Sequence, residues 1–145
     1  MTASRLLVAV SARSIAAVDE SITLPQFRLL VVLSTQGAVK LMQVAEQLGV
    51  APSTATRMID RLIDAGLVDR ETNPNSRREV VVSLSTQGRA VVRQVTQRRR
   101  REISRIVARM PGQQRHGLIA ALEAFTIAGG EPPVRIADSG GADWI

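Results

Sequence analysis

Residues 44–70, VAEQLGVAPSTATRMIDRLIDAGLVDR, carry the pattern of two short helices joined by a tight turn. The first helix is predicted to stop at Gly49, because glycine readily adopts the left-handed conformation that follows a helix. Pro52 falls in the first turn of the second helix, where its missing N–H costs little, and Gly66 marks that helix's end. Only about three residues, Gly49 to Ala51, separate the helices, so they are expected to cross steeply. This is the arrangement of a helix-turn-helix.

The second helix of this pair is predicted to be amphipathic. Its apolar positions repeat at helical spacing and its opposite face is polar. The apolar stripe consists of Ala55, Met58, Ile59, Leu62 and Ile63. The polar face consists of Ser53, Thr54, Arg57, Asp60, Arg61 and Asp64. In a DNA-binding helix-turn-helix, the N-terminal half of the second helix enters the major groove.

Several side chains on this helix suit DNA chemistry. The short hydroxyl side chains, which can approach phosphates or base edges, are those of Ser53, Thr54 and Thr56. Arg57 and Arg61 are four residues apart and share a face, where a guanidinium can pair with O6 and N7 of guanine. The alternative is a solvated face on which the two arginines pair with Asp60 and Asp64. Exposed pairs of that kind contribute less than about 1 kcal/mol and explain little, so we interpret the arginines as DNA contacts.

Two runs suited to β-strands follow, at Val68–Thr72 and Val80–Leu84. Between them a polar turn, NPNS, leads into Arg77 and Arg78. A two-stranded hairpin directly after a helix-turn-helix makes a winged helix. The wing arginines are predicted to lie over the neighbouring minor groove, because a narrow A/T minor groove concentrates negative potential and attracts arginine. The alternative is an ordinary charged hairpin tip that discourages edge-to-edge pairing.

The rest of the chain is predicted to be mostly helical. Further helices, with their caps, are expected at residues 4–18, 23–37, 85–110 and 113–128. Thr23 and Gln26 have the spacing of a capping box, and Ser85 is placed as the cap of the long helix. The fold class is therefore mainly α with a small β-hairpin wing.

Charge points to an acidic partner. The chain has 145 residues and a formal net charge of +6. Residues 51–115 hold 14 arginines and 6 acidic residues, so the positive charge gathers in the region of the predicted DNA contacts. A basic patch of this kind is the electrostatic footprint of nucleic-acid binding.

Composition also sets aside other classes of function. There is no cysteine, which excludes disulfides and cysteine-based zinc sites, and His116 is the only histidine, so no metal or other cofactor is expected. No apolar run approaches the ~20 residues of a membrane span, and the N-terminus does not read as a signal peptide, so a cytoplasmic protein is expected. Asp60 and Asp64 lie between arginines with no nucleophile nearby. We therefore do not expect an enzyme.

Over about residues 22–92 the sequence resembles the multiple-antibiotic-resistance regulator (MarR) family of winged helix-turn-helix transcription factors. The resemblance rests on three stretches, ITLPQFRLL, VAEQLGVAPSTATRMIDRLIDAGLVDR and NPNSRREVVVSLSTQG. The family places a Thr-Arg pair of the recognition helix on DNA, and Thr56 and Arg57 match this pair. Arg78 matches the family's wing arginine. The family's following Leu-Thr/Ser-x-x-Gly is matched by Leu84, Ser85 and Gly88.

Two positions depart from the family pattern. Ser76 stands where the wing usually has an aspartate, so a carboxylate that could orient a wing arginine is missing. Ala51 stands where many relatives have a serine before the proline of the recognition helix. A good N-cap stabilises a helix by about 1 kcal/mol relative to alanine, so this helix is expected to begin without that contribution.

The resemblance implies a homodimer built from N- and C-terminal dimerisation helices. The expected organisation is residues 1–20 for an N-terminal dimerisation helix, 21–88 for the winged helix-turn-helix, 89–128 for C-terminal dimerisation helices and 129–145 for an irregular tail. The apolar residues assigned to the dimer interface are Leu6, Leu7, Val10, Leu118, Leu122 and Phe125.

The function implied is sequence-specific binding of double-stranded DNA at a pseudo-palindromic operator, usually for repression, which a small-molecule effector relieves in some relatives. Family pockets often hold aromatic acids, but this chain has no tyrosine and two phenylalanines, so a stacking cage is not expected. Aliphatic walls with Arg13 or Arg28 could instead hold an amphipathic anion. The alternative function is a winged helix used for protein–protein contact without specific DNA binding.

Overall fold

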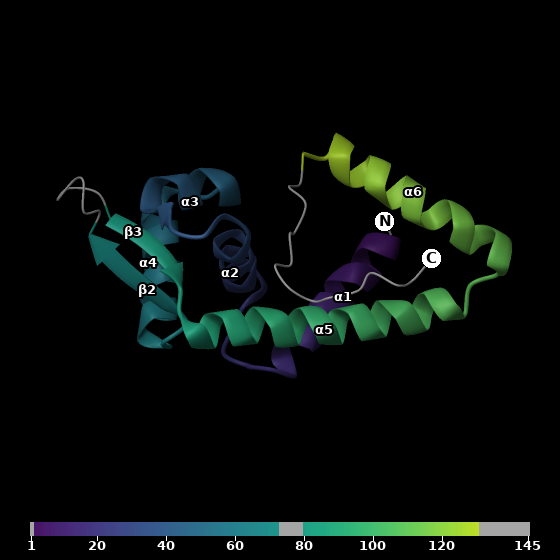
Figure 1. Ribbon diagram of the computed structural model, residues 1–145, viewed down its shortest axis with the longest axis horizontal. Helices are drawn as coiled ribbons and strands as arrows, with labels where there is room; N and C mark the ends of the chain where they lie inside the picture. Colours follow the sequence, from purple (N-terminus) through teal and green to yellow (C-terminus); the bar gives the residue numbers. More distant parts are fainter. Residues whose placement is uncertain (1, 73–79, 131–145) are drawn as a thin grey trace. The chain divides into compact units, whose positions relative to one another are not determined.

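The computed structural model describes residues 2–72 and 80–130 (Figure 1). The described residues fall into two units, divided after residue 106. In chain order the elements are α1 (Thr2–Ala16), α2 (Leu24–Gln36), β1 (Val39–Lys40), α3 (Leu41–Leu48), α4 (Pro52–Asp64), β2 (Val68–Thr72), β3 (Val80–Leu84), α5 (Thr86–Ala108) and α6 (Gly112–Ala128). The predicted class, mainly helical with a small β wing, is confirmed.

Glycines end both helices of the helix-turn-helix, as predicted. Gly49 follows α3 with φ of 64° and Gly66 follows α4 with φ of 71°, a region that other residues rarely occupy. After α4 the N–H of Leu67 donates to the C=O of Leu62 at 2.9 Å, and the N–H of Gly66 donates to the C=O of Ile63 at 2.8 Å. These two bonds form a Schellman motif, which stops the helix and turns the chain into β2.

The start of α2 is held by the predicted capping box. The N–H of Thr23 donates to Oε1 of Gln26 at 2.8 Å, and the N–H of Gln26 donates to Oγ1 of Thr23 at 3.4 Å. Pro25 lies in the first turn and Gly37 follows the last residue. Local sequence signals therefore set both ends of this helix.

The first helix ends two residues earlier than predicted, at Ala16 rather than at residue 18. The carboxylate of Asp19 accepts hydrogen bonds from the N–H of Ser21 at 2.9 Å and from its hydroxyl at 2.6 Å. A side chain that bonds backbone two residues on favours a turn over a helix. Val18, which was predicted to be helical, instead packs against the core from this turn.

The sheet has three strands rather than the predicted two-stranded hairpin. Strands β2 and β3 pair in antiparallel register from Val68 opposite Leu84 to Thr72 opposite Val80. The additional strand β1 pairs with the other edge of β3, with Val39 opposite Val82, so the order is β1-β3-β2. Two residues are too few to show the alternating pattern by which a strand is recognised in a sequence.

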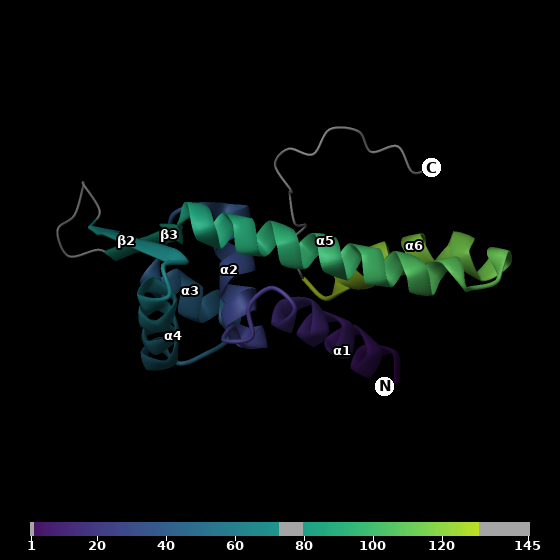
Figure 2. The same cartoon turned by 90° about the horizontal axis from the view of Figure 1, so that it is seen from below.

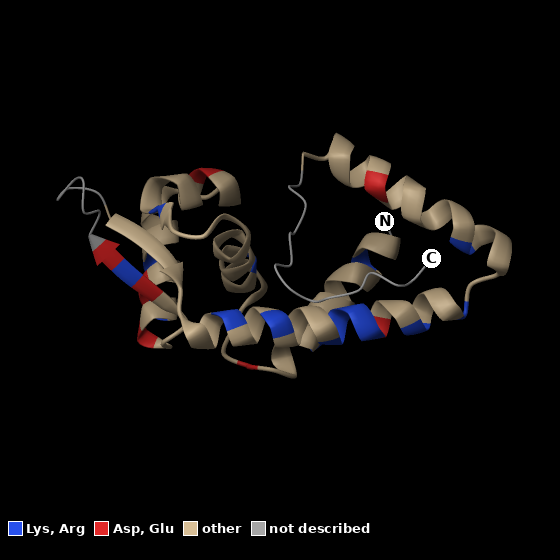
Figure 3. Cartoon of the chain, viewed as in Figure 1, with Lys and Arg blue, Asp and Glu red and all other residues tan. Residues whose placement is uncertain are grey.

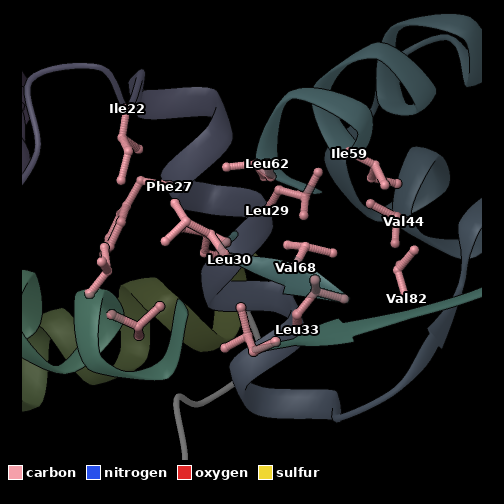
Figure 4. Packing of buried hydrophobic residues seen from close by; sticks show 14 of the residues in the cluster. Ile22, Phe27, Leu29, Leu30, Leu33, Val44, Ile59, Leu62, Val68 and Val82 are labelled. Carbon is pink, nitrogen blue, oxygen red and sulfur yellow. The ribbon is translucent and has the colours of Figure 1, made fainter. Parts of the chain in front are cut away.

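Among the described residues, an apolar core lies between α2, the helix-turn-helix, the sheet and the first half of α5, and it includes Ile15 of α1 (Figure 4). Its fully buried members include Leu29, Leu30, Leu33, Ile59, Leu62, Leu67, Val44, Val68, Val82 and Val95. Burial of one such side chain stabilises a fold by about 1.5–3 kcal/mol. Because α4 contributes Ile59 and Leu62 to this core, its opposite face is directed to solvent. Figures 1 and 2 both show α4 beside β2.

Among the helices of residues 2–72 and 80–130, none combines the length and apolar character that a membrane crossing requires.

Candidate nucleic-acid interface

The predicted recognition helix α4 is amphipathic in the structure. Ala55, Ile59 and Leu62 are at most 1% exposed, and Met58 and Ile63 pack against the core. On the other side the exposed residues are Ser53, Arg57, Asp60, Arg61 and Asp64, and the half-buried ones are Thr54 and Thr56. The polar face inferred from the sequence is thus the accessible face of a helix whose back is fixed in the core.

Arg57 and Arg61 project from this face without protein partners in the described part of the chain. Neither makes a hydrogen bond or an ion pair with another residue there. Asp60, which lies between them, instead pairs with Arg70 of β2, with 3.5 Å between Oδ1 and Nη1. The alternative in which the two arginines are satisfied by Asp60 and Asp64 is therefore not what the structure shows. Both guanidinium groups keep their donors for a ligand.

Thr56 is placed differently from a free hydroxyl donor. Its Oγ1 donates to the C=O of Pro52 at 2.9 Å, one turn earlier in α4. The hydroxyl hydrogen is therefore already used. The oxygen of Thr56 can still accept a hydrogen bond, but a phosphate group has no hydrogen to donate to it. Base amino groups in the major groove do offer hydrogens, and the Thr56 methyl suits the methyl of thymine. If α4 contacts DNA, a base edge is therefore a better partner for Thr56 than a phosphate.

The N-terminus of α4 has no side-chain cap, as expected from Ala51. Ala51 is the N-cap residue with an extended backbone, and Pro52 takes the first helical position. The amides of Thr54 and Ala55 both bond the C=O of Ala51, at 2.9 and 3.1 Å. Pro52 has no N–H, so the amide of Ser53 is the first-turn N–H of α4 that remains for an anion at the positive end of the helix dipole.

The wing is only partly covered by the described residues. The tip, residues 73–79 with Ser76, Arg77 and Arg78, lies outside them, so the minor-groove assignment of the two arginines stays a prediction. Strand β2 carries an acidic, a basic and another acidic residue in succession, at Asp69, Arg70 and Glu71 (Figure 3). Sequence reasoning did not single out Arg70. Its pairing with Asp60 depends on β2 lying against α4, which no local pattern reveals.

The residues assigned to a dimer interface are not equally accessible. Leu6 and Leu7 of α1 are 45% and 49% exposed, whereas Val10 is completely buried within the single chain. Val10 therefore packs inside the chain rather than on an accessible face. In α6, Leu122 and Phe125 are 48% and 76% exposed and Leu118 is half-buried.

The two arginines suggested as anion contacts in a ligand pocket are already engaged. Arg13 of α1 forms an ion pair with Glu102 of α5, to which both Nε and Nη2 donate. Arg28 is exposed on α2 and also interacts with another part of the chain. An anionic ligand at Arg13 would have to displace a carboxylate. No group of histidine, cysteine and acidic residues within residues 2–72 and 80–130 is arranged to hold a metal ion.

Comparison with known proteins agrees with this geometry. Residues 22–80 match the sequence profile of the MarR family. A crystal structure of RV1404 from Mycobacterium tuberculosis is 60% identical, with a TM-score of 0.88 over 92% of this chain and 91% of that one. An HTH-type transcriptional regulator of Mycobacterium bovis is 30% identical over 112 residues, which cover 77% of this chain and 78% of that protein.

The multiple antibiotic resistance protein MarR of Salmonella typhimurium is 36% identical over 77 residues, or 53% of this chain. This chain spans about half the length of that relative, 54%. A winged helix whose recognition helix presents unpaired arginines is a form that DNA-binding regulators of transcription take. The chain belongs to the MarR family of such regulators.

Proposed function

We propose that this protein binds double-stranded DNA sequence-specifically through α4 and thereby regulates transcription, as a repressor in the cytoplasm. The observation that carries the proposal is the pair Arg57 and Arg61, exposed on one face of α4 and unpaired with any described residue. An arginine left without a carboxylate partner keeps its planar fork of donors available. Such a fork matches both the guanine edge and the phosphate group.

We expect base contacts to provide sequence specificity and phosphate contacts to provide most of the sequence-independent affinity. Bidentate pairing of Arg57 with guanine is expected to discriminate bases, and Thr56 supplies an acceptor beside it. Phosphate contacts from the uncapped start of α4 and from the wing, including Ser53 and Arg78, supply the sequence-independent part. The formal net charge of +6 supports attraction to the polyanion over a distance.

A homodimer is part of the proposal. In α6, residues 112–128, no side chain is buried, although Ile119, Leu122, Phe125 and Ile127 are large and apolar. A helix with this much uncovered apolar surface is expected to bury it against a partner. A second copy of the chain is the partner that would also double the recognition helix. Two copies related by a two-fold axis then read a pseudo-palindrome with half-sites about 10 bp apart.

A salt series tests DNA binding directly. The probe is a duplex selected from a randomised pool by the wild-type protein, and its affinity is measured from low to moderate salt. We expect log K to fall with log salt by about 0.9 for each phosphate neutralised, giving a slope of several units. Arg57→Ala should weaken binding to the selected duplex, whereas Arg105→Ala removes the same charge from the exposed surface of α5 and should change it little.

A flat salt response would contradict the proposal. Equal binding by wild type and Arg57→Ala would also contradict the assignment of α4. Either result would point to a winged helix that contacts another protein.

A further inference from the structure

Ser85 connects the end of the recognition helix to the start of α5. Its hydroxyl donates to the C=O of Gly66 at 2.7 Å, and its N–H donates to the C=O of Leu67 at 3.1 Å. Gly66 and Leu67 are the residues that close the Schellman motif after α4. Both hydrogen-bond donors of Ser85 therefore bind carbonyl groups of the turn that ends the recognition helix.

The same hydroxyl also begins the next helix. Ser85 Oγ accepts the N–H of Gly88 at 2.9 Å, which is the bond of an N-cap residue to the third residue of its helix. Because the oxygen accepts from α5 while its hydrogen points to Gly66, the two bonds fix the orientation of the hydroxyl. Arg89 adds a third tie at this end of α5, with Nη1 donating to the C=O of Leu84 at 2.7 Å.

Gly88 makes the contact between α5 and this turn tight. A Cβ atom at Gly88 would lie 2.1 Å from the backbone oxygen of Leu67 and 3.1 Å from Cδ2 of Leu84. The first of these neighbours is backbone and cannot rotate away. The start of α5 therefore rests directly on the turn after α4, with the buried side chains of Leu67 and Leu84 around it.

We propose that Ser85 and Gly88 form a rigid joint that sets the tilt of α4 relative to α5, and that both are positioning residues for DNA recognition. Neither residue needs to touch DNA. The inference rests on the proposed function in one respect: in a dimer held together by helices, the angle between α4 and α5 determines how far apart the two recognition helices lie. A movement of α5 would then also move α4, because Ser85 holds the turn at Gly66 and Leu67 in a fixed position.

Three substitutions at Ser85 separate the joint from the helix cap. Ser85→Thr keeps both the donor and the acceptor. Ser85→Asp keeps an acceptor for the N–H of Gly88 and is a good N-cap, but it has no hydrogen to give to Gly66. Ser85→Ala removes both bonds. Ser34→Ala is the matched control, since Ser34 is an exposed serine whose hydroxyl donates to the C=O of Val31 within one helix.

The tilt of α4 can be measured without DNA. The chain has no cysteine, so spin labels placed by Ala51→Cys and Gln94→Cys report one distance within the chain when labelled protein is diluted with unlabelled protein. Both positions are exposed, one at the far end of α4 and one on α5. A tilt of α4, which has 13 residues, by about 10° would move its N-terminus by about 3 Å.

We expect the distance distribution to shift or widen by at least that amount in Ser85→Asp and Ser85→Ala, and to stay unchanged in Ser85→Thr and Ser34→Ala. A wild-type distribution in Ser85→Asp, which retains the cap and so the fold, would overturn the proposal.

The second arm measures operator geometry. On the selected duplex, insertion of one base pair between the half-sites should weaken wild-type binding by about tenfold, the order of one mismatched base pair. A loosened joint should reduce that penalty to about threefold or less in Ser85→Asp, while Ser85→Thr keeps it. An unchanged penalty in Ser85→Asp would contradict the role in DNA recognition. If the wild type bound no DNA, the proposed function would fail, and the label distances would still decide whether the joint exists.

Discussion

Asp60 of the recognition helix lies with Oδ1 3.5 Å from Nη1 of Arg70 on β2. The pair places a neutralised carboxylate between Arg57 and Arg61, on the face that we assign to DNA. Both side chains are about half exposed, 51% for Asp60 and 44% for Arg70, so the pair contributes little to stability. On the proposed DNA-binding face, we expect Arg70 to reduce the repulsion between the Asp60 carboxylate and DNA phosphates.

Arg70→Ala is therefore expected to weaken DNA binding by about three- to tenfold, while the free energy of unfolding changes by less than about 1 kcal/mol. Asp60→Asn should restore much of the lost affinity in the double variant, since it removes the charge that Arg70 masks. Equilibrium binding and urea unfolding of the two single variants and the double variant check this. Strictly additive effects on affinity would show that Arg70 does not act through Asp60.

Gly88→Ala should destabilise the protein by roughly 2–4 kcal/mol, because the new methyl group would overlap the backbone oxygen of Leu67. Gly117→Ala in α6 is the contrasting variant. A Cβ atom there meets nothing within 4 Å, and alanine is the better helix former by about 0.5–1 kcal/mol. In thermal unfolding, the melting temperature of Gly88→Ala should be below that of the wild type and the melting temperature of Gly117→Ala above it. A neutral Gly88→Ala would mean that α5 does not rest on the turn as described.

Ala51→Ser should stabilise α4 by about 1 kcal/mol, because the hydroxyl can accept an amide at the uncapped start of the helix. Ala51→Val is the control that adds a side chain without an acceptor, and it should give no such gain. The midpoint of chemical unfolding measures both variants. Equal stability of the serine and valine variants would show that the N-terminal amides of α4 are already satisfied.

Phe125→Glu should dissociate the proposed dimer, since Phe125 is 76% exposed in the single chain and the substitution would place a charge in the proposed apolar interface. Truncation or replacement of a central aromatic contact costs roughly 2 kcal/mol or more of association free energy. Gln114→Glu adds the same charge at an exposed polar position of α6 and should leave the dimer intact. Sedimentation equilibrium decides between these outcomes. An unchanged association constant for Phe125→Glu would move the interface away from α6.

Much of the fold could be predicted because proline, glycine and capping residues act locally. Pro52 and Gly66 bound the recognition helix, and the two strands of the wing were predicted with the bounds that the structure shows, Val68–Thr72 and Val80–Leu84. The apolar stripe of α4 was also predicted, because burial at helical spacing is visible in any single sequence.

Contacts between distant segments could not be predicted in the same way. Arg13 meets Glu102 across 89 positions, and the bond from Ser85 to Gly66 spans 19. The sequence predicted Ser85 as the cap of α5, but not as the link to the preceding helix. In the sequence, Val10 falls on the same apolar helix face as Leu6 and Leu7. Only the folded chain shows that the side chain of Val10 is already buried.

The central claim is that α4 reads bases through Arg57, and base discrimination tests it most directly. Wild type and Arg57→Ala are compared on the selected duplex and on all its single base-pair substitutions at one salt concentration. We expect Arg57→Ala to lose about 1–3 kcal/mol of discrimination at one position in each half-site, with preferences elsewhere retained. Uniform weakening across all duplexes, or an unchanged preference at every position, would contradict the claim.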